Sequence, residues 1–259
     1  MKKLFVTDLD GTLLENHVSI TEENLNYVKK LKELNHCFAI ATGRAYDHIE
    51  ALQREYKLDV DYYILLNGAL LLDKHGCVIN HQTIPMSTIE AIVEEFYNDD
   101  WRIYFGTGFR SFRLNFEEGK IVNANNVVIE GIEEIKQENI SMFAMDYKRE
   151  DINYVEDVCR KINSRFGDKI VAYRNVSFID IVPAGCSKGN GVDYIKKKEQ
   201  ISGENTFTIG DSWNDVSMFK ASKHSFTFKR AEKELQLKAK YVVDTVAECI
   251  GKYILEDVS

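Results

Sequence analysis

The stretch LFVTDLDGT, residues 4–12, decides the fold. It opens with a short apolar run, Leu4–Val6, of the kind that forms a buried strand. Asp8 and Asp10 follow, and Gly11 permits a sharp turn out of the strand. Residues two apart in a strand point to the same side, so the two carboxylates would share one site if the strand runs that far. The stretch therefore predicts a strand that ends in a pair of acids.

The first and last thirds of the chain alternate strands and helices. Thr21 can cap a helix whose apolar residues share one face, namely Leu25, Val28, Leu31 and Leu34. Further strands are expected at 37–40, 62–66, 206–209 and 241–243, and further helices at 47–56, 188–199 and 214–221. This alternation predicts an α/β fold with a doubly wound, Rossmann-like parallel sheet and right-handed crossovers.

The middle of the chain has a different pattern. Strand-like runs are expected at 102–105, 112–116, 142–146, 170–174 and 178–182, and helices at 88–98 and 152–166. Runs of strands with separate helices indicate an α+β unit inserted into the α/β unit. We place the inserted unit at residues 81–182, which leaves residues 1–80 and 183–259 for the α/β core.

Composition and charge exclude several classes of protein. The 259 residues carry a net charge of -8, which argues against a general nucleic-acid binder and requires any bound phosphate to be held by local positive features. The sequence indicates no signal peptide and no membrane helix. Five scattered cysteines without a CxxC pair are typical of reduced thiols, so we expect a cytoplasmic protein with no nucleic-acid or membrane partner.

Four polar segments follow predicted parallel strands, where open α/β sheets bind ligands. They are DLDGT (8–12), ATGR (41–44), SKG (187–189) and GDSWND (210–215). Each also has an ordinary structural interpretation: an acidic turn, a strand-to-helix loop, a solvated lysine and a helix cap.

The first two segments suit phosphate chemistry. Two adjacent carboxylates repel each other unless a cation or a shared proton compensates, which suits a nucleophile beside a general acid/base with Mg²⁺ nearby. The hydroxyl of Thr42 and the backbone N–H of Gly43 can both donate to a phosphate oxygen.

The last two segments add a cation and further oxygen ligands. Lys188 falls in the first turn of a predicted helix, where the macrodipole disfavours a cation, and an anion bound there would remove the conflict. Asp211 ends a strand, while Asn214 and Asp215 open the next helix. Carboxylate oxygens are ligands that Mg²⁺ prefers.

The order and spacing of DLDGTLL, ATGR, SKGNG and GDSWND resemble the haloacid dehalogenase (HAD) superfamily. Within it, the chain resembles the Cof-type phosphatases, whose type IIB α/β cap lies between the second and third motifs. The resemblance covers essentially the whole chain. It implies a hydrolase, a phosphoric monoester hydrolase, in which the inserted unit is a cap that sets substrate specificity.

The resemblance also implies roles for single residues. Asp8 would be the nucleophile, and Asp10 the general acid/base that lends its backbone carbonyl to Mg²⁺. The implied metal set is Asp8, Asp10, Asp211 and Asp215, the last through a water. The implied phosphate and substrate set is Leu9, Thr42, Gly43, Arg44, Asn67, Lys188 and Asn214. Arg44 could instead pair at the surface, and Asn67-Gly68 is also a simple turn pair.

We therefore expect a Mg²⁺-dependent phosphomonoesterase that forms an aspartyl-phosphate on Asp8. The substrate would be a small phosphorylated metabolite, with sugar phosphates the first choice by resemblance. Dehalogenation is disfavoured, because a halide leaving group needs no proton from Asp10. A phosphomutase and an idle phospho-ligand sensor stay open as alternatives. One departure concerns the segment Phe226–Ala231, which replaces an MGNA-like stretch of many Cof-type sequences at the edge of the site.

Overall fold

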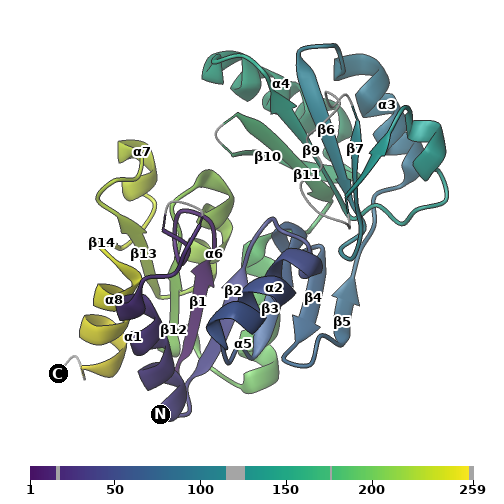
Figure 1. Cartoon of the computed structure of the whole chain (residues 1–259). Helices are drawn as coiled ribbons and strands as arrows, with labels where there is room; N and C mark the ends of the chain where they lie inside the picture. Colours follow the sequence, from purple (N-terminus) through teal and green to yellow (C-terminus); the bar gives the residue numbers. More distant parts are fainter. Residues whose placement is uncertain (16–17, 115–125, 176, 257–259) are drawn as a thin grey trace.

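The computed structural model describes residues 1–15, 18–114, 126–175 and 177–256, which form two lobes (Figure 1). The larger, the core lobe, is built on an eight-stranded sheet of the described residues. Its spatial order is β14 (Tyr241–Val243), β13 (His224–Phe228), β12 (Thr206–Ile209), β1 (Leu4–Asp8), β2 (Cys37–Ala41), β3 (Tyr62–Leu65), β4 (Leu70–Asp73) and β5 (Val78–His81). The strands from β14 to β3 are parallel to one another, whereas β4 pairs antiparallel with both of its neighbours, β3 and β5.

Helices cover both faces of the core sheet, which explains why β1 begins with three successive apolar residues. Phe5 packs on the side of helix α1 (Glu22–Glu33) and the C-terminal segment. Leu4 and Val6 pack on the opposite side, against α5 (Lys188–Glu199) and α6 (Val216–Ala221). Successive strand residues point to opposite faces, so a central strand with two covered faces needs apolar residues at every position.

The remaining α-helices of the described core lobe are α2 (Tyr46–Tyr56), α7 (Lys233–Gln236) and α8 (Val246–Cys249), and a π-helical segment, Ile250–Leu255, follows α8. Thr21 caps α1 as predicted, because its hydroxyl oxygen accepts a hydrogen bond from the backbone N–H of Asn24 at 3.3 Å. No helix in the described ranges is long and apolar enough to cross a bilayer.

The smaller, the cap lobe, is built on a second sheet of six strands among the described residues. Its order is β10 (Ile170–Asn175), β11 (Phe178–Pro183), β9 (Met142–Tyr147), β6 (Trp101–Gly106), β7 (Ser111–Leu114) and β8 (Asn126–Ile129). Helices α3 (Met86–Phe96) and α4 (Ile152–Phe166) pack on one face through Ile89, Ile92, Val158 and Ile162. The other face is turned toward the core lobe (Figure 1).

The predicted α/β class is confirmed, and helices 188–199 and 152–166 have the predicted bounds. Strands β4, β5, β8 and β13 were not predicted. The strand predicted over 112–116 corresponds to β7, and residues 115 and 116 lie outside the described ranges.

One placement is wrong. The SKG segment was expected after a strand of the parallel sheet, but it follows β11, an antiparallel strand of the cap lobe. Ser187 caps α5, which returns the chain to the core lobe, and Lys188 is the first residue of that helix. The helix start, rather than a strand end, therefore places the lysine.

Candidate active site

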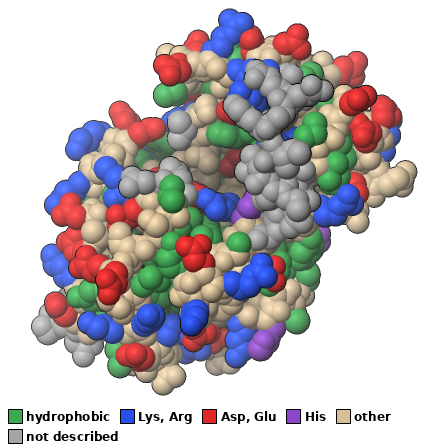
Figure 2. Space-filling model, in the orientation of Figure 1, with side chains coloured by type: hydrophobic (Ala, Val, Ile, Leu, Met, Phe, Trp, Pro, Cys, Tyr) green, Lys and Arg blue, Asp and Glu red, His purple; other side chains and the backbone are tan. Residues whose placement is uncertain are grey.

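A cleft of about 660 Å³ lies between the two lobes. It is visible as a hollow in the space-filling view (Figure 2). The predicted site residues that line it are Asp8, Asp10, Thr42, Gly43, Arg44, Asp211 and Asn214. The polar residues that the cap lobe contributes are Tyr104, Ser111, Arg113, Asn175, Ser177 and Asp180. The cleft thus joins three of the four sequence motifs to the polar face of the cap sheet.

Lys188 lies beneath this cleft, between two carboxylates. Its Nζ is 2.6 Å from Oδ1 of Asp8 and 2.6 Å from Oδ1 of Asp215, and the residue is 1% exposed. Burial lowers the pKa of Lys188, but Asp215 and Asp8 together outweigh burial and raise it. The ammonium therefore stays charged, and in this structure the two carboxylates balance it.

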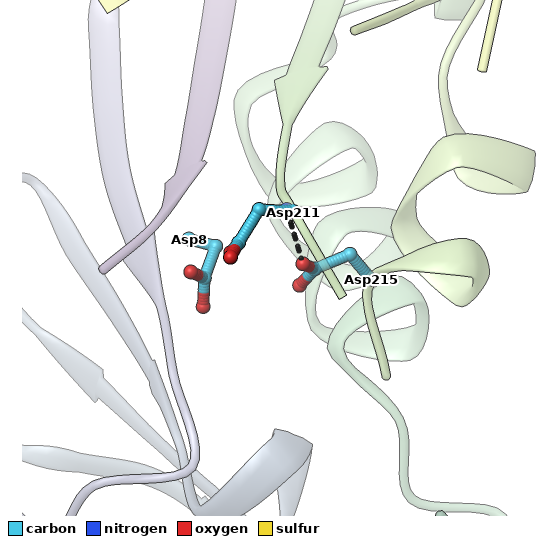
Figure 3. Close-up of side chains that lie close together, drawn as sticks. All are labelled: Asp8, Asp211 and Asp215. Carbon is cyan, nitrogen blue, oxygen red and sulfur yellow. Dashed lines mark hydrogen bonds between the residues drawn. The ribbon is translucent and has the colours of Figure 1, made fainter. Parts of the chain in front are cut away.

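Asp8, Asp211 and Asp215 form a compact acidic cluster (Figure 3). One carboxylate oxygen from each lies within 4.8 Å of the others. Burial raises the pKa of Asp8 well above its usual value, Asp215 and Asp211 raise it further, and Lys188 opposes the shift. Burial and Asp215 likewise raise the pKa of Asp211. Three carboxylates with one lysine carry more negative charge than the site compensates.

The cluster fits a hard divalent cation, because its donors are all oxygens. Asp215 is already engaged: Oδ1 meets Lys188, and Oδ2 accepts the backbone N–H of Asp211 at 2.9 Å and of Ser212 at 3.0 Å. Oδ1 of Asp211 accepts the hydroxyl of Thr12 at 2.9 Å. The second oxygens of Asp8 and Asp211 are thus the candidate direct ligands, with Asp215 as a support that orients its neighbours.

Asp10 reaches the cleft from the turn rather than from the strand. β1 ends at Asp8, so the alternation of strand side chains does not bring Asp10 there. Its carboxylate forms a two-point ion pair with Arg44, in which Arg44 Nε lies 2.8 Å from Oδ2 and Nη2 meets Oδ1. Arg44 therefore both pairs and lines the cleft.

The remaining predicted residues surround this centre. Thr42 Oγ1 accepts the backbone N–H of Arg44 at 3.1 Å. Asn67 is buried behind the cleft, with Asn214 Nδ2 3.2 Å from its Oδ1. The side chain of Leu9 is buried in the core and does not line the cleft.

The segment Phe226–Ala231 lies beside the first motif. Phe226, Thr227 and Phe228 end β13, and the Arg230 guanidinium lies 3.7 Å from the centre of the Phe228 ring. Arg230 Nη2 donates to the backbone oxygen of Gly11 at 2.5 Å. This unusual segment therefore supports the turn that carries Asp10.

Sequence reasoning missed the contribution of the cap lobe to the cleft. Asp180 is the one charged residue within β11, FIDIVP, and it is 5% exposed on the cleft face. Its neighbours Ile179 and Ile181 point into the cap core. An acid at an alternate position in an apolar strand was the available signal, since its side chain must leave the core face.

Relatives and solved structures match this chain over most of its length. An uncharacterised protein of Mycoplasma capricolum is 26% identical, covering 96% of this chain and 99% of the relative. The 5-amino-6-(5-phospho-D-ribitylamino)uracil phosphatase of Bacillus subtilis is 25% identical, covering 83% and 82%. The structure of a sugar phosphatase of HAD subclass IIB superposes with a TM-score of 0.77 at 22% identity, covering 95% of each chain.

The sequence pattern of one family matches residues 5–254, from β1 to the C-terminal segment. That span includes the acidic cluster, Lys188 and the cap lobe together. The match confirms the resemblance seen in the four motifs: the chain belongs to the haloacid dehalogenase-like hydrolases.

Proposed function

We propose that the protein is a Mg²⁺-dependent phosphomonoesterase that hydrolyses a small phosphorylated metabolite through an aspartyl-phosphate on Asp8. The observation that carries the proposal is the placement of Asp8, which is buried at the cleft, 2.6 Å from Lys188 and beside the acids Asp211 and Asp215. A carboxylate nucleophile needs positive charge nearby, because its own charge and that of the incoming phosphate repel each other, and Lys188 together with a metal on the acids would supply it.

The residues divide the chemistry between two steps. Asp8 attacks phosphorus, the bond from phosphorus to the ester oxygen breaks, and Asp10 gives its proton to the leaving oxygen. Asp10 then takes a proton from water, which attacks the aspartyl-phosphate and releases phosphate. Asp8, Asp211 and the backbone carbonyl of Asp10 would hold Mg²⁺, with Asp215 in support. When bound, the metal would supply positive charge to the phosphoryl oxygens.

Phosphate binding falls to groups that donate hydrogen bonds. Lys188, the hydroxyl of Thr42 and the backbone at Gly43 would hold the phosphoryl oxygens, and Asn214 would orient them. The backbone of Leu9, between the two catalytic acids, belongs to the same set. Arg44 holds Asp10 at the cleft and would meet the leaving group beside it. Asn67 lies behind the cleft and would hold Asn214 in place through the hydrogen bond between the two side chains.

The cap, residues 81–182, would select the substrate. Its cleft face carries Tyr104, Ser111, Arg113 and Ser177, a surface of hydrogen-bonding groups that suits a polyhydroxylated leaving group. We therefore propose a sugar phosphate or a related polyol phosphate. A subclass IIB sugar phosphatase has the same fold, and a relative acts on a phosphorylated ribityl compound. The five free thiols fit a cytoplasmic setting.

The test is release of inorganic phosphate from p-nitrophenyl phosphate and a panel of sugar phosphates, with Mg²⁺ and with EDTA. We expect metal-dependent release by the wild type and none by Asp8→Asn. Release that persists at the wild-type rate in a folded Asp8→Asn protein would sink the mechanism. Conversion between phospho-isomers without free phosphate would indicate a mutase instead.

A further inference from the structure

Three buried side chains connect the cap lobe to the phosphate site. Asp180 lies on β11 of the cap lobe, Asn67 in the turn after β3, and Asn214 in the turn after β12. Asn67 Nδ2 is 3.0 Å from Oδ2 of Asp180, and Asn214 Nδ2 is 3.2 Å from Oδ1 of Asn67. All three are buried, so water does not replace these contacts. They form one chain of hydrogen bonds from the cap sheet to the cleft.

The chain of hydrogen bonds has a fixed donor-to-acceptor direction. A carboxylate only accepts hydrogen bonds, so Asp180 must be met by the NH₂ group of Asn67. The amide oxygen of Asn67 then points the other way and must be met by the NH₂ group of Asn214. Burial raises the pKa of Asp180, but hydrogen bonds from Asn67 and Asn175 oppose the shift and favour the accepting form.

The hydrogen-bond chain ends with Asn214, at the proposed phosphate site. Asn214 lines the cleft one residue before Asp215, and among the described residues its Oδ1 has no hydrogen-bond partner. Buried polar atoms normally have partners, so this one indicates a group that the cleft receives. Without the carboxylate at position 180, either flip of the two amides would be equally satisfied.

We propose that Asp180 is a cap-borne positioning residue that sets the amide orientation of Asn67 and, through it, of Asn214 for phosphate binding. This rests on the proposed function. The two amides are oriented only while β11 sits over the core lobe, so phosphate binding is coupled to the position of the cap. Asp180 acts on the phosphate common to all substrates, and its loss should not depend on the leaving group.

Two variants and a matched control separate this role from direct recognition of the leaving group. Asp180→Leu keeps the branched shape of the side chain, with a larger volume, and removes the acceptor, whereas Asp180→Asn keeps an acceptor but permits both amide directions. Asp146→Asn is the control, because Asp146 is also buried on the cap sheet but pairs with Arg102 at 3.3 Å and does not line the cleft.

The measurements are kcat and KM for esters with different leaving groups, and the inhibition constant of inorganic phosphate. For Asp180→Leu we expect the inhibition constant of phosphate to rise about tenfold, the size of effect seen when a residue that orients a binding group is lost. We expect kcat/KM to fall by a similar factor for every ester. Asp180→Asn should lie between it and the wild type, and Asp146→Asn should match the wild type. An unchanged inhibition constant, or losses confined to some leaving groups, would overturn the proposal and leave the phosphatase function standing.

A second readout does not depend on turnover. The side-chain NH₂ protons of Asn67 and Asn214 should exchange slowly in the wild type and fast in Asp180→Leu, as seen by NMR of the folded proteins. Equal exchange in both proteins would overturn the proposal. A wild type that hydrolyses no ester would refute the proposed function. The exchange data would then be the test of whether Asp180 orients the two amides.

Discussion

The charge balance of the cleft depends on Lys188. It is the buried cation between Asp8 and Asp215, and it holds both through contacts of 2.6 Å. The sequence predicted a lysine that an anion would compensate at the helix start, and the structure compensates it with carboxylates. Phosphate and metal would therefore enter a site whose internal ion pairs are already formed.

Replacing Lys188 with Met should destabilise the protein more than any single change among its acidic partners. The variant leaves two buried carboxylates without their cation, and breaking a buried pair in this way costs about 3–5 kcal/mol. Urea unfolding in EDTA measures the change in free energy. Asp8→Asn should change stability much less, since an amide oxygen still accepts from Lys188 and one negative charge is removed. Equal stability of Lys188→Met and the wild type would contradict the ion-pair geometry.

The thiols provide an independent check at single residues. Burial raises the pKa of Cys37 to about 12, of Cys159 to about 12 and of Cys186 to about 11, and it raises that of Cys249 well above its usual value. Cys77 is exposed. Because the thiolate is the reactive form, a thiol reagent at pH 8 should label only Cys77 in the folded protein. Rapid labelling of a Cys77→Ser variant before unfolding would contradict the burial of the other four.

At the level of elements, strand β1 carries Asp8 and helix α5 carries Lys188, and both elements could be predicted from local pattern. The apolar run before Asp8 and the capping Ser187 fix their ends without reference to other parts of the chain. The alternation within β11 indicates that Asp180 leaves the cap core, but not which residues it meets, because that depends on how the two lobes come together. The pairing of Asp10 with Arg44 joins the loops that follow two strands of the core lobe, and neither loop pattern contains it.

Helices α5 and α6 are in contact beside Lys188, and Gly189 lies at this contact, with its backbone N–H 3.1 Å from Oγ of Ser217. A Cβ at Gly189 would lie 2.3 Å from the backbone oxygen of Ser217, so Gly189→Ala must push the helices apart. We expect a loss of about 1–3 kcal/mol in stability together with reduced turnover. Thermal unfolding and phosphate release measure the two effects.

Gly131→Ala is the matched control for that variant. A Cβ at Gly131 meets nothing within 4 Å, and its φ of −160° is extended backbone. The control should behave as the wild type does. If both alanine variants were equally stable and active, the close approach of α5 and α6 would not hold Lys188.

At the scale of the whole molecule, the cleft lies between the acidic cluster of the core lobe and the polar face of the cap sheet. The acidic cluster has three carboxylates beside one lysine, although the net charge of the protein is already -8. The overall field therefore does not attract an anionic substrate, and binding depends on the local cations. A divalent metal is the simplest way to complete the balance.

Mg²⁺ should stabilise the folded protein, since the unfolded chain has no assembled cluster. At a hundredfold excess over its dissociation constant, a ligand adds about 2.7 kcal/mol. For a protein of this size that raises the melting temperature by about 5 °C or more. Asp211→Asn should lose most of the shift in a thermal melt, whereas Asp244→Asn, an exposed acid paired with Lys229, should keep it. An equal shift in both variants would place the metal elsewhere.

The most direct test of the central claim is to look for the phosphoryl group on the protein during turnover. The enzyme is mixed with substrate and Mg²⁺, quenched in acid, digested and analysed by mass spectrometry. We expect one phosphoryl group on the peptide that contains Asp8, and none in Asp8→Asn. Steady turnover with no modified peptide, or with the phosphoryl group on another residue, would contradict nucleophilic attack by Asp8.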